Sequence, residues 1–311
     1  MTFTTKLKDE ITKNEIDKIE SLVELSAFIK YAGQIKKNKI TLVMENASVA
    51  RRIYKNIKMN FGINIKITIR NQKRFRVKQI YILEISEKVD FILETLNIMK
   101  NNKKILPEEY FLSSEEEKIS FIRGAFLACG SINDPASSGY HLELTSSMKK
   151  EGTFLSALLK EFNIISKTIK RNNHYMTYIK SAEMISDLIR LMGATNCFFY
   201  FEDIRIYRDH KNMVNRLNNC EIANQEKILK TGMKQLDDIK YLKEFDLLGL
   251  LDENVQEAIK YREAYPETSL QELADIISTE TGRQIGKSGI NHYFIKVKKL
   301  VEKHKENNKK L

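Results

Sequence analysis

The spacing of apolar and polar residues predicts two consecutive repeats of helices and strands. In the first repeat, Val49, Ile53 and Ile57 recur every four residues, which is typical of the buried face of an amphipathic helix. The elements expected here are a helix, a strand, a helix, the two strands of a hairpin and a closing helix, at residues 21–33, 39–43, 47–61, 63–70, 75–85 and 89–99.

The second repeat follows the same order about one hundred residues later. Its elements are expected at residues 117–130, 140–145, 152–162, 165–170, 175–179 and 182–192. Phe61-Gly62-Ile63 and Phe162-Asn163-Ile164 fall at equivalent places in the two copies. We read both copies as α-β-β-α-β-β-α, and a repeat of this length indicates duplicated domains rather than a solenoid.

The opening helix of each repeat ends in small side chains. When the two helices are aligned, Ala27 and Gly33 of the first copy match Gly124 and Gly130 of the second copy. We number these pairs as the third and ninth positions of a nine-residue motif that ends each helix. Glycine costs up to about 1 kcal/mol inside a helix, but small residues let two helix backbones approach closely. This arrangement resembles the LAGLIDADG homing-endonuclease fold, whose motif helices pack at a pseudo-dyad and whose two sheets form a saddle for DNA.

The resemblance implies a metal-binding acid at the eighth motif position, where this chain has Ala32 and Cys129. Phosphodiester cleavage with two Mg²⁺-type ions needs carboxylate ligands, which neither side chain supplies. We therefore expect a chain that is not an enzyme and has no catalytic residues, metal site or other cofactor. A working endonuclease with divergent acids is the alternative, which a divalent-metal cleavage assay would reveal.

The charge of the chain favours a polyanionic partner. The 311 residues carry a formal net charge of +11. The net charge is +11 in residues 1–106, −3 in 107–204, +4 in 205–243, −4 in 244–264 and +3 from 265 onward. No run of about 18 apolar residues predicts a membrane span, and the first residues lack the apolar core of a signal peptide. We expect a cytoplasmic, nucleoid-associated protein that does not bind membranes.

The hairpin of the first repeat is densely basic. It has no acid between Lys66 and Tyr81. A two-stranded ribbon fits the DNA major groove, where Lys and Arg side chains meet phosphates and guanine edges. The side chains expected to contact DNA are Lys66, Arg70, Arg74, Arg76 and Lys78. The alternative for these residues is the solvated outer face of a sheet.

The segment 205–243 mixes basic side chains with many asparagines. Asparagine has poor helix propensity, whereas amides and guanidinium groups suit contacts with phosphates and base edges. The residues expected to bind DNA in this segment are Arg208, Lys211, Asn212, Asn215 and Arg216. A solvated connecting helix is the alternative.

Three helices are predicted near the carboxyl end, at residues 255–263, 270–278 and 289–302. Ser269 is placed to cap the second helix, with Glu272 completing a capping box. Ser288 is placed to cap the third. This arrangement resembles a helix-turn-helix, in which the last helix enters the major groove by its first turns. The connection from Ser278 to Lys287 is longer than the usual turn, which favours a winged or sigma-factor-like variant.

The first turns of the last helix supply the candidate base contacts of a helix-turn-helix that spans about Thr268 to Lys303. These candidates are Lys287, Ser288, Asn291, His292 and Lys296. A small helical bundle for protein contact is the alternative.

The combination of two degenerate LAGLIDADG-like halves with a helix-turn-helix resembles the bacterial WhiA regulators over nearly the full chain. The matching stretches are MTFTTKLKDEI at 1–11, RGAFLACGSINDP at 123–135, YHLE at 140–143, FEDIR at 201–205, RDHKNMVNRLNNCEIAN at 208–224 and KSGINHYF at 287–294. The resemblance implies DNA binding in the control of cell division, chromosome segregation and, in sporulating relatives, sporulation genes. The chain departs from the family at Lys211, where an Arg is usual, and in the extended connection after Ser278.

The sequence thus predicts an α+β protein in which a LAGLIDADG-like pseudo-dimer precedes an all-α helix-turn-helix domain. The expected domains are the first half, the second half, the connecting segment and the helix-turn-helix, at 1–106, 107–204, 205–243 and 244–311. Double-stranded DNA is the expected partner of a non-enzymatic transcriptional regulator, and the internal pseudo-dyad favours a monomer. The alternatives are a nucleoid-associated protein or an interaction scaffold without sequence-specific readout.

Overall fold

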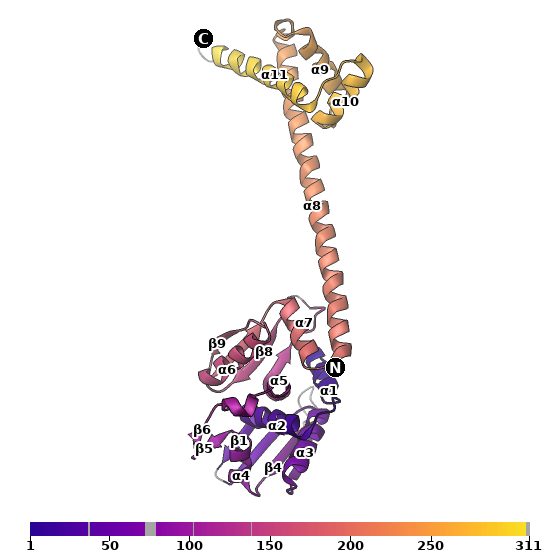
Figure 1. Ribbon diagram of the computed structural model, residues 1–311. Helices are drawn as coiled ribbons and strands as arrows, with labels where there is room; N and C mark the ends of the chain where they lie inside the picture. The colour runs from indigo at the N-terminus through magenta and orange to yellow at the C-terminus, as the bar shows by residue number, and fades with distance from the viewer. Residues whose placement is uncertain (37, 72–78, 102, 138, 309–311) are drawn as a thin grey trace. The chain divides into compact units, whose positions relative to one another are not determined.

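The computed structural model divides into two compact units, Met1–Arg208 and Asp209–Leu311 (Figure 1). The structure describes residues 1–36, 38–71, 79–101, 103–137 and 139–308. No helix in these described ranges is long and apolar enough to cross a membrane.

From α2 to α4, the first half of the first unit has the element order that the sequence predicts. Its elements are α1 (Phe3–Ile11), α2 (Lys18–Ala32), β1 (Gly33–Lys36), β2 (Lys39–Met44), α3 (Ala47–Phe61), β3 (Lys66–Asn71), β4 (Gln79–Ile85), α4 (Val89–Thr95) and the short strands β5 (Met99–Lys100) and β6 (Lys103–Lys104). The larger sheet is antiparallel, with strand order β1-β2-β4-β3. Apolar residues of α2 and α3 cover one face of this sheet, and the other face is open.

The second half repeats this architecture. Its elements are the 3-10 turn η1 (Glu109–Leu112), α5 (Glu115–Cys129), β7 (Gly130–Ile132), β8 (Leu142–Ser146), α6 (Lys149–Glu161), β9 (Lys167–Arg171), β10 (His174–Ile179) and α7 (Ala182–Leu191). The strand order β7-β8-β10-β9 is equivalent to that of the first half. The predicted duplication of an α-β-β-α-β-β-α unit is therefore confirmed.

Two features of the first unit differ from the sequence-based expectation. The helix predicted at 89–99 ends at Thr95, because Asn97 adopts a left-handed conformation (φ 53°) and the chain then enters β5. In addition, α1 was not predicted. Its Thr4 hydroxyl bonds the backbone of Ile132 in β7, and its Glu10 carboxylate accepts hydrogen bonds from the first N–H groups of α8 (Thr195–Glu244).

The two motif helices, α2 and α5, lie side by side in the first unit (Figure 1). A Cβ atom added at Gly124 would lie 2.2 Å from the carbonyl oxygen of Glu24 and 2.9 Å from the Cβ atom of Ala27. Only glycine fits at this contact, because the facing atom is backbone and cannot rotate away. The close helix packing predicted from the small residues is therefore present.

A buried ion cluster joins α2 to its neighbours beside this contact. The Glu24 carboxylate has no solvent exposure, and it accepts two hydrogen bonds from the Arg52 guanidinium of α3, at 2.5 and 2.8 Å. Arg123 Nε of α5 lies 3.0 Å from Oε2 of the same carboxylate. Removing one member would strand a buried charge, at a cost of about 3–5 kcal/mol.

The second unit encloses a separate core around the carboxyl-terminal part of α8 (Figure 1). Its further elements are the 3-10 turn η2 (Leu248–Leu250), α9 (Glu253–Ala264), α10 (Leu270–Thr281) and α11 (Lys287–Asn308). Ile290, Phe294, Val297 and Val301 form the buried stripe of α11. This is the apolar face that the sequence predicts for the last helix.

The α2–α5 contact generates the first prediction. Gly124→Ala should destabilise the first unit by about 1–3 kcal/mol, because the added methyl group forces two packed backbones apart. Calorimetry of the full chain should show a melting temperature several degrees lower. The matched control is Gly249→Ala, where an added Cβ atom meets nothing within 4 Å. Equal melting temperatures for the two variants would contradict the close contact.

Candidate nucleic-acid interface

The second helix of the carboxyl-terminal trio, α10, has the cap that the sequence predicts. The Glu272 backbone N–H donates to the Ser269 hydroxyl (3.1 Å), and the Ser269 N–H donates to the Glu272 carboxylate (2.7 Å). Gly282 ends the helix in the left-handed conformation (φ 68°). Both ends of α10 are therefore fixed by local contacts.

The connection to α11 is shorter than predicted. Helix α10 continues to Thr281, because the hydroxyls of Thr279 and Thr281 donate back to carbonyls one turn earlier, at 2.8 and 2.6 Å. Helix α11 begins at Lys287, so Ser288 lies inside it and does not cap it. Residues 282–286 separate the two helices, so the connection is shorter than the predicted one but still longer than the usual turn of three to four residues.

The predicted recognition residues lie on the first turns of α11. Lys287, Ser288, Asn291 and His292 are all exposed. Lys296 is half-buried, and its ammonium group lies 2.7 Å from the carboxylate of Asp252, at the start of α9. Four of the five side chains thus face solvent, whereas the fifth has an acidic partner within its own unit.

The sequence reading missed Ile295, which is 41% exposed and lies one turn after Asn291 on the same face of α11. An exposed apolar side chain beside polar ones suits contact with the methyl group of thymine. The sequence does contain a signal for this exposure, because Ile295 falls outside the apolar stripe of α11 that packs into the core of the second unit.

A buried arginine fixes the start of α10. Arg262 of α9 is 1% exposed and has no acidic partner among the described residues. Its Nη1 donates to the Thr268 carbonyl (2.7 Å) and the Tyr265 carbonyl (3.3 Å). The guanidinium also lies over the ring of Phe294 in α11, 5.6 Å from its centroid. Arg262 therefore connects all three helices of the trio.

The basic hairpin is only partly described by the structure. Lys66 and Arg70 are exposed and share the open face of β3, as their even spacing predicts. Arg74, Arg76 and Lys78 lie outside the described residues. On β4, the carboxylate of Glu84 pairs with Lys39 (2.5 Å) and Lys66 (3.7 Å), and these contacts, led by the Lys39 hydrogen bond, lower its pKa. Part of the positive charge of this face is thus neutralised.

The residues predicted to bind DNA in the connecting segment all lie on α8, but they differ in surroundings. Arg208 donates to the carbonyls of Pro135 and Ser137, both at 2.7 Å, and its guanidinium stacks over the ring of Tyr140. It therefore anchors α8 within the first unit. The exposed members of the set are Lys211, Asn212, Asn215 and Arg216.

The motif positions that hold acids in homing endonucleases lie at the ends of α2 and α5. The Cys129 thiol donates to the Ala125 carbonyl (3.2 Å), and burial raises the pKa of this thiol to about 12. It is a neutral thiol near pH 7, which is a poor ligand for a hard cation. Within the described ranges, no three His, Cys, Asp or Glu side chains form a group that could hold a metal ion.

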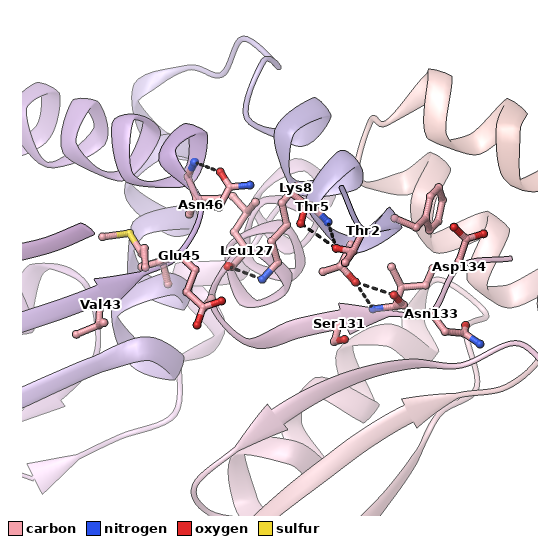
Figure 2. Close-up of a pocket in the computed structure, with 17 residues that line it drawn as sticks. Thr2, Thr5, Lys8, Val43, Glu45, Asn46, Leu127, Ser131, Asn133 and Asp134 are labelled. Atoms are coloured by element: carbon pink, nitrogen blue, oxygen red, sulfur yellow. Dashed lines mark hydrogen bonds between the residues drawn. The ribbon is translucent and has the colours of Figure 1, made fainter. Parts of the chain in front are cut away.

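A hollow of about 820 Å³ lies in the first unit, between the start of α1, the β2–α3 junction and β7. Figure 2 shows the side chains that line it. Lys8 lies in it, and its ammonium group donates to the Leu127 carbonyl (3.1 Å). Burial lowers the pKa of Lys8, while the nearby Cys129 and Glu45 act in the opposite direction. Asp134 adds a second carboxylate to the lining. The mixed charge gives this hollow no preference for a polyanion.

Known protein families and relatives match almost the whole chain. Three family models match: the WhiA N-terminal LAGLIDADG-like domain at residues 18–99, the WhiA LAGLIDADG-like domain at 118–211 and the WhiA C-terminal HTH domain at 214–301. The chain is 38% identical over 309 residues to a protein of Bacillus velezensis named probable cell division protein WhiA, covering 97% of this chain and 96% of that one. A Bacillus cereus protein of the same name is 36% identical, with 97% of each covered.

Solved structures share the fold. The crystal structure of full-length WhiA from Thermotoga maritima matches with a TM-score of 0.58 and 23% identity, over 97% of this chain and 99% of that chain. The crystal structure of an N-terminal LAGLIDADG domain of WhiA matches with a TM-score of 0.51 and 23% identity, over 62% of this chain and 90% of that chain.

Arg262 generates the second prediction. Arg262→Met should destabilise the second unit by about 2–3 kcal/mol, because the carbonyls of Tyr265, Pro266 and Thr268 lose a charged donor while the packing volume is kept. Chemical unfolding followed by hydrogen exchange in α10 would measure the loss. Lys260→Met is the matched control, since Lys260 is exposed on the same helix, and it should change stability by less than about 0.5 kcal/mol. A stable Arg262→Met variant would show that the guanidinium does not organise the trio.

Proposed function

The chain belongs to the WhiA family, and we propose that it is a DNA-binding transcriptional regulator that acts in cell division and chromosome segregation. The observation that carries this proposal is the exposed polar face at the start of α11. Lys287, Ser288, Asn291 and His292 project from the part of the helix that enters the major groove in helix-turn-helix proteins.

The chemistry of this face suits base reading. Asn291 can bond the two edge atoms of adenine, and Ile295 can contact the methyl group of thymine. Lys287 can neutralise a backbone phosphate, which supplies affinity without sequence preference. Arg262 positions α10 and α11 for these contacts from inside the unit.

We propose that the LAGLIDADG-like unit binds DNA without cutting it. Ala32 and Cys129 occupy the motif positions where carboxylates would hold metal ions, which supports a role without catalysis. The open face with Lys66 and Arg70 would add affinity from phosphate contacts, moderated by Glu84. Such contacts would keep the protein on the nucleoid between specific sites.

The cellular role rests on the names of the relatives. The two Bacillus proteins are named probable cell division proteins, and this chain matches them along almost its full length. A second candidate role, as a nucleoid-associated protein without sequence readout, would depend on the basic face of the first sheet instead of α11. Variants in the two places distinguish these roles.

The third prediction concerns base reading by α11. The double variant Asn291→Ala/His292→Ala should weaken binding to a specific site by about 30-fold to 10,000-fold, since two base contacts of about 1–3 kcal/mol each are lost. Binding to random duplex DNA, and its salt dependence, should change little. Fluorescence anisotropy on a site selected from a random library would measure both.

The same dipeptide supplies the matched control. Asn173 and His174 lie at the β9–β10 turn of the first unit, and Asn173→Ala/His174→Ala should leave specific binding within about twofold of the unaltered chain, a change of less than about 0.5 kcal/mol. If both double variants bind specific and random DNA alike, the proposed readout by α11 is wrong and the nucleoid-associated role gains support.

The fourth prediction concerns catalysis. Incubation of supercoiled plasmid with the full chain and Mg²⁺ or Mn²⁺ should give no nicked or linear product above that of a matched buffer. Cleavage that depends on the metal ion and on the chain would contradict the proposed loss of nuclease chemistry, and it would direct attention to acids outside the motif.

A further inference from the structure

A second hollow in the first unit, of about 650 Å³, lies on the outer side of α3. One wall is α3, and the other wall is the end of α1 together with the loop that leads to α2. We call it the α1–α3 hollow. Its volume falls within the range of pockets that hold a small molecule, about 300–1,000 Å³.

The side chains of the α3 wall recur at intervals of three and four residues, which places them on one side of the helix. They are Ser48, Arg51, Lys55 and Met59. The buried stripe that packs onto the sheet belongs to another side of α3. The hollow therefore lies away from the open face of the sheet, to which the proposed function assigns contacts with DNA.

The middle of the α1–α3 hollow carries positive charge without a counter-ion. Lys13, Arg51 and Lys55 are exposed, and no acid among the described residues forms an ion pair with any of them. Arg51 donates to the Ser48 hydroxyl (3.2 Å), which keeps its guanidinium beside the wall. Arg51 and Lys55 stand one helical turn apart, so their long side chains can reach the same ligand.

Two carboxylates, those of Asp9 and Glu15, also line this hollow. Asp9 accepts a hydrogen bond from the amide of Asn46 (2.9 Å), which caps the start of α3, so it lies at one end of the α3 wall. The three unpaired cations outnumber these two acids. The balance is reversed in the larger hollow beside Lys8, where the acids outnumber the cation. Only the α1–α3 hollow of these two thus favours an anion.

The loop wall is fixed by buried contacts before any ligand binds. Arg52, which is 8% exposed, donates from Nη1 to the carbonyls of Thr12 (3.1 Å) and Asn14 (2.7 Å). The Asn14 amide in turn donates to the Met192 carbonyl (2.9 Å). Lys13 lies between these two anchored residues, so its backbone is held opposite α3. A preformed wall lowers the entropy that binding costs.

The other end of the α1–α3 hollow is apolar. Met59, which is 41% exposed, stands one helical turn beyond Lys55. The loop runs alongside α3 toward it, because the amide of Asn60 donates to the Ser21 hydroxyl (2.9 Å) at the start of α2. Ile16 therefore joins Met59 in the lining. The hollow changes from cationic to apolar along the helix.

We propose that the α1–α3 hollow binds a nucleotide that carries at least two phosphates. Lys13, Arg51 and Lys55 bind the phosphates through charge-assisted hydrogen bonds, and Met59 and Ile16 contact the base. A DNA duplex suits the hollow less well, because its backbone phosphates come with no exposed base for the apolar end. The proposal goes beyond the proposed function and does not depend on it.

The fifth prediction tests nucleotide binding in the absence of DNA. Isothermal titration calorimetry of the full chain with ADP, GDP, CDP and UDP should show binding of at least one of them, with a dissociation constant below about 1 mM. Inorganic pyrophosphate has the two phosphates but no base. It should bind at least about tenfold more weakly than that nucleotide, because it makes no contact with the apolar end.

The double variant Arg51→Gln/Lys55→Gln should weaken binding of that nucleotide at least about tenfold, since both charged donors of α3 are lost. The matched control is Lys149→Gln/Lys160→Gln, which removes the same charge from exposed positions on α6, the equivalent helix of the second half. It should leave the dissociation constant within about twofold, because distant exposed charges are screened by salt. Both variants should melt at the temperature of the unaltered chain.

Four results would overturn the proposal. The first is no binding of any of the four nucleotides. The second is pyrophosphate binding as tight as theirs, which would indicate an anion site that does not recognise a base. The third is equal weakening in both double variants, which would indicate an effect of overall charge. The fourth is weaker binding of random duplex DNA by the Arg51→Gln/Lys55→Gln variant than by its control, without any change in nucleotide binding.

That last result would assign the hollow to the DNA backbone. Since nucleotide binding is measured without DNA and changes no residue of α11, its failure is distinguishable from failure of base reading.

Discussion

The contact between the backbones of α2 and α5 positions everything else in the first unit. Each helix leads directly into the first strand of its sheet, so the distance between the helices sets the distance between the two sheets. Gly124 permits that distance, because any side chain at this position would collide with the Glu24 carbonyl. The Glu24 carboxylate then binds an arginine from α3 and one from α5, which joins both halves through a single buried charge.

This dependence separates the motif residues that the fold requires from those that metal binding would require. The glycines of the motif are required by packing, whereas the acid position next to each of them is required only by metal binding. Ala32 and Cys129 lie next to this packing contact and leave it intact, whereas a side chain in place of Gly124 would separate the helices. A scaffold of this kind is available for a role in DNA binding that involves no cleavage.

Much of the fold could be predicted because its signals are local. The four-residue spacing of Val49, Ile53 and Ile57 and the capping box at Ser269 each depend on residues within one helix. The errors arose where local signals compete or where partners are distant in sequence. The predicted second helix stops at Ser278, whereas α10 continues to Thr281, and the hydroxyls of Thr279 and Thr281 bond back into it.

The candidate interface, too, could be predicted where its signals are local and not where its contacts join residues that are distant in sequence. Helical periodicity located the exposed residues at the start of α11, but it could not show that Lys296 pairs with Asp252, 44 residues away. The carbonyls held by Arg262 lie in a turn that no periodicity describes. Charge density alone also overstated the positive charge of the first sheet, because Glu84 neutralises part of its basic face.

The central claim is that α11 selects the sites of this chain on the chromosome. Chromatin-bound DNA sequencing of the unaltered chain, beside an Asn291→Ala/His292→Ala/Lys296→Ala variant, tests it most directly. The account predicts sharp peaks over a shared sequence that are lost in the variant while the protein level is unchanged. Broad occupancy that is the same in both strains would contradict it, and would place DNA binding in the basic face of the first unit.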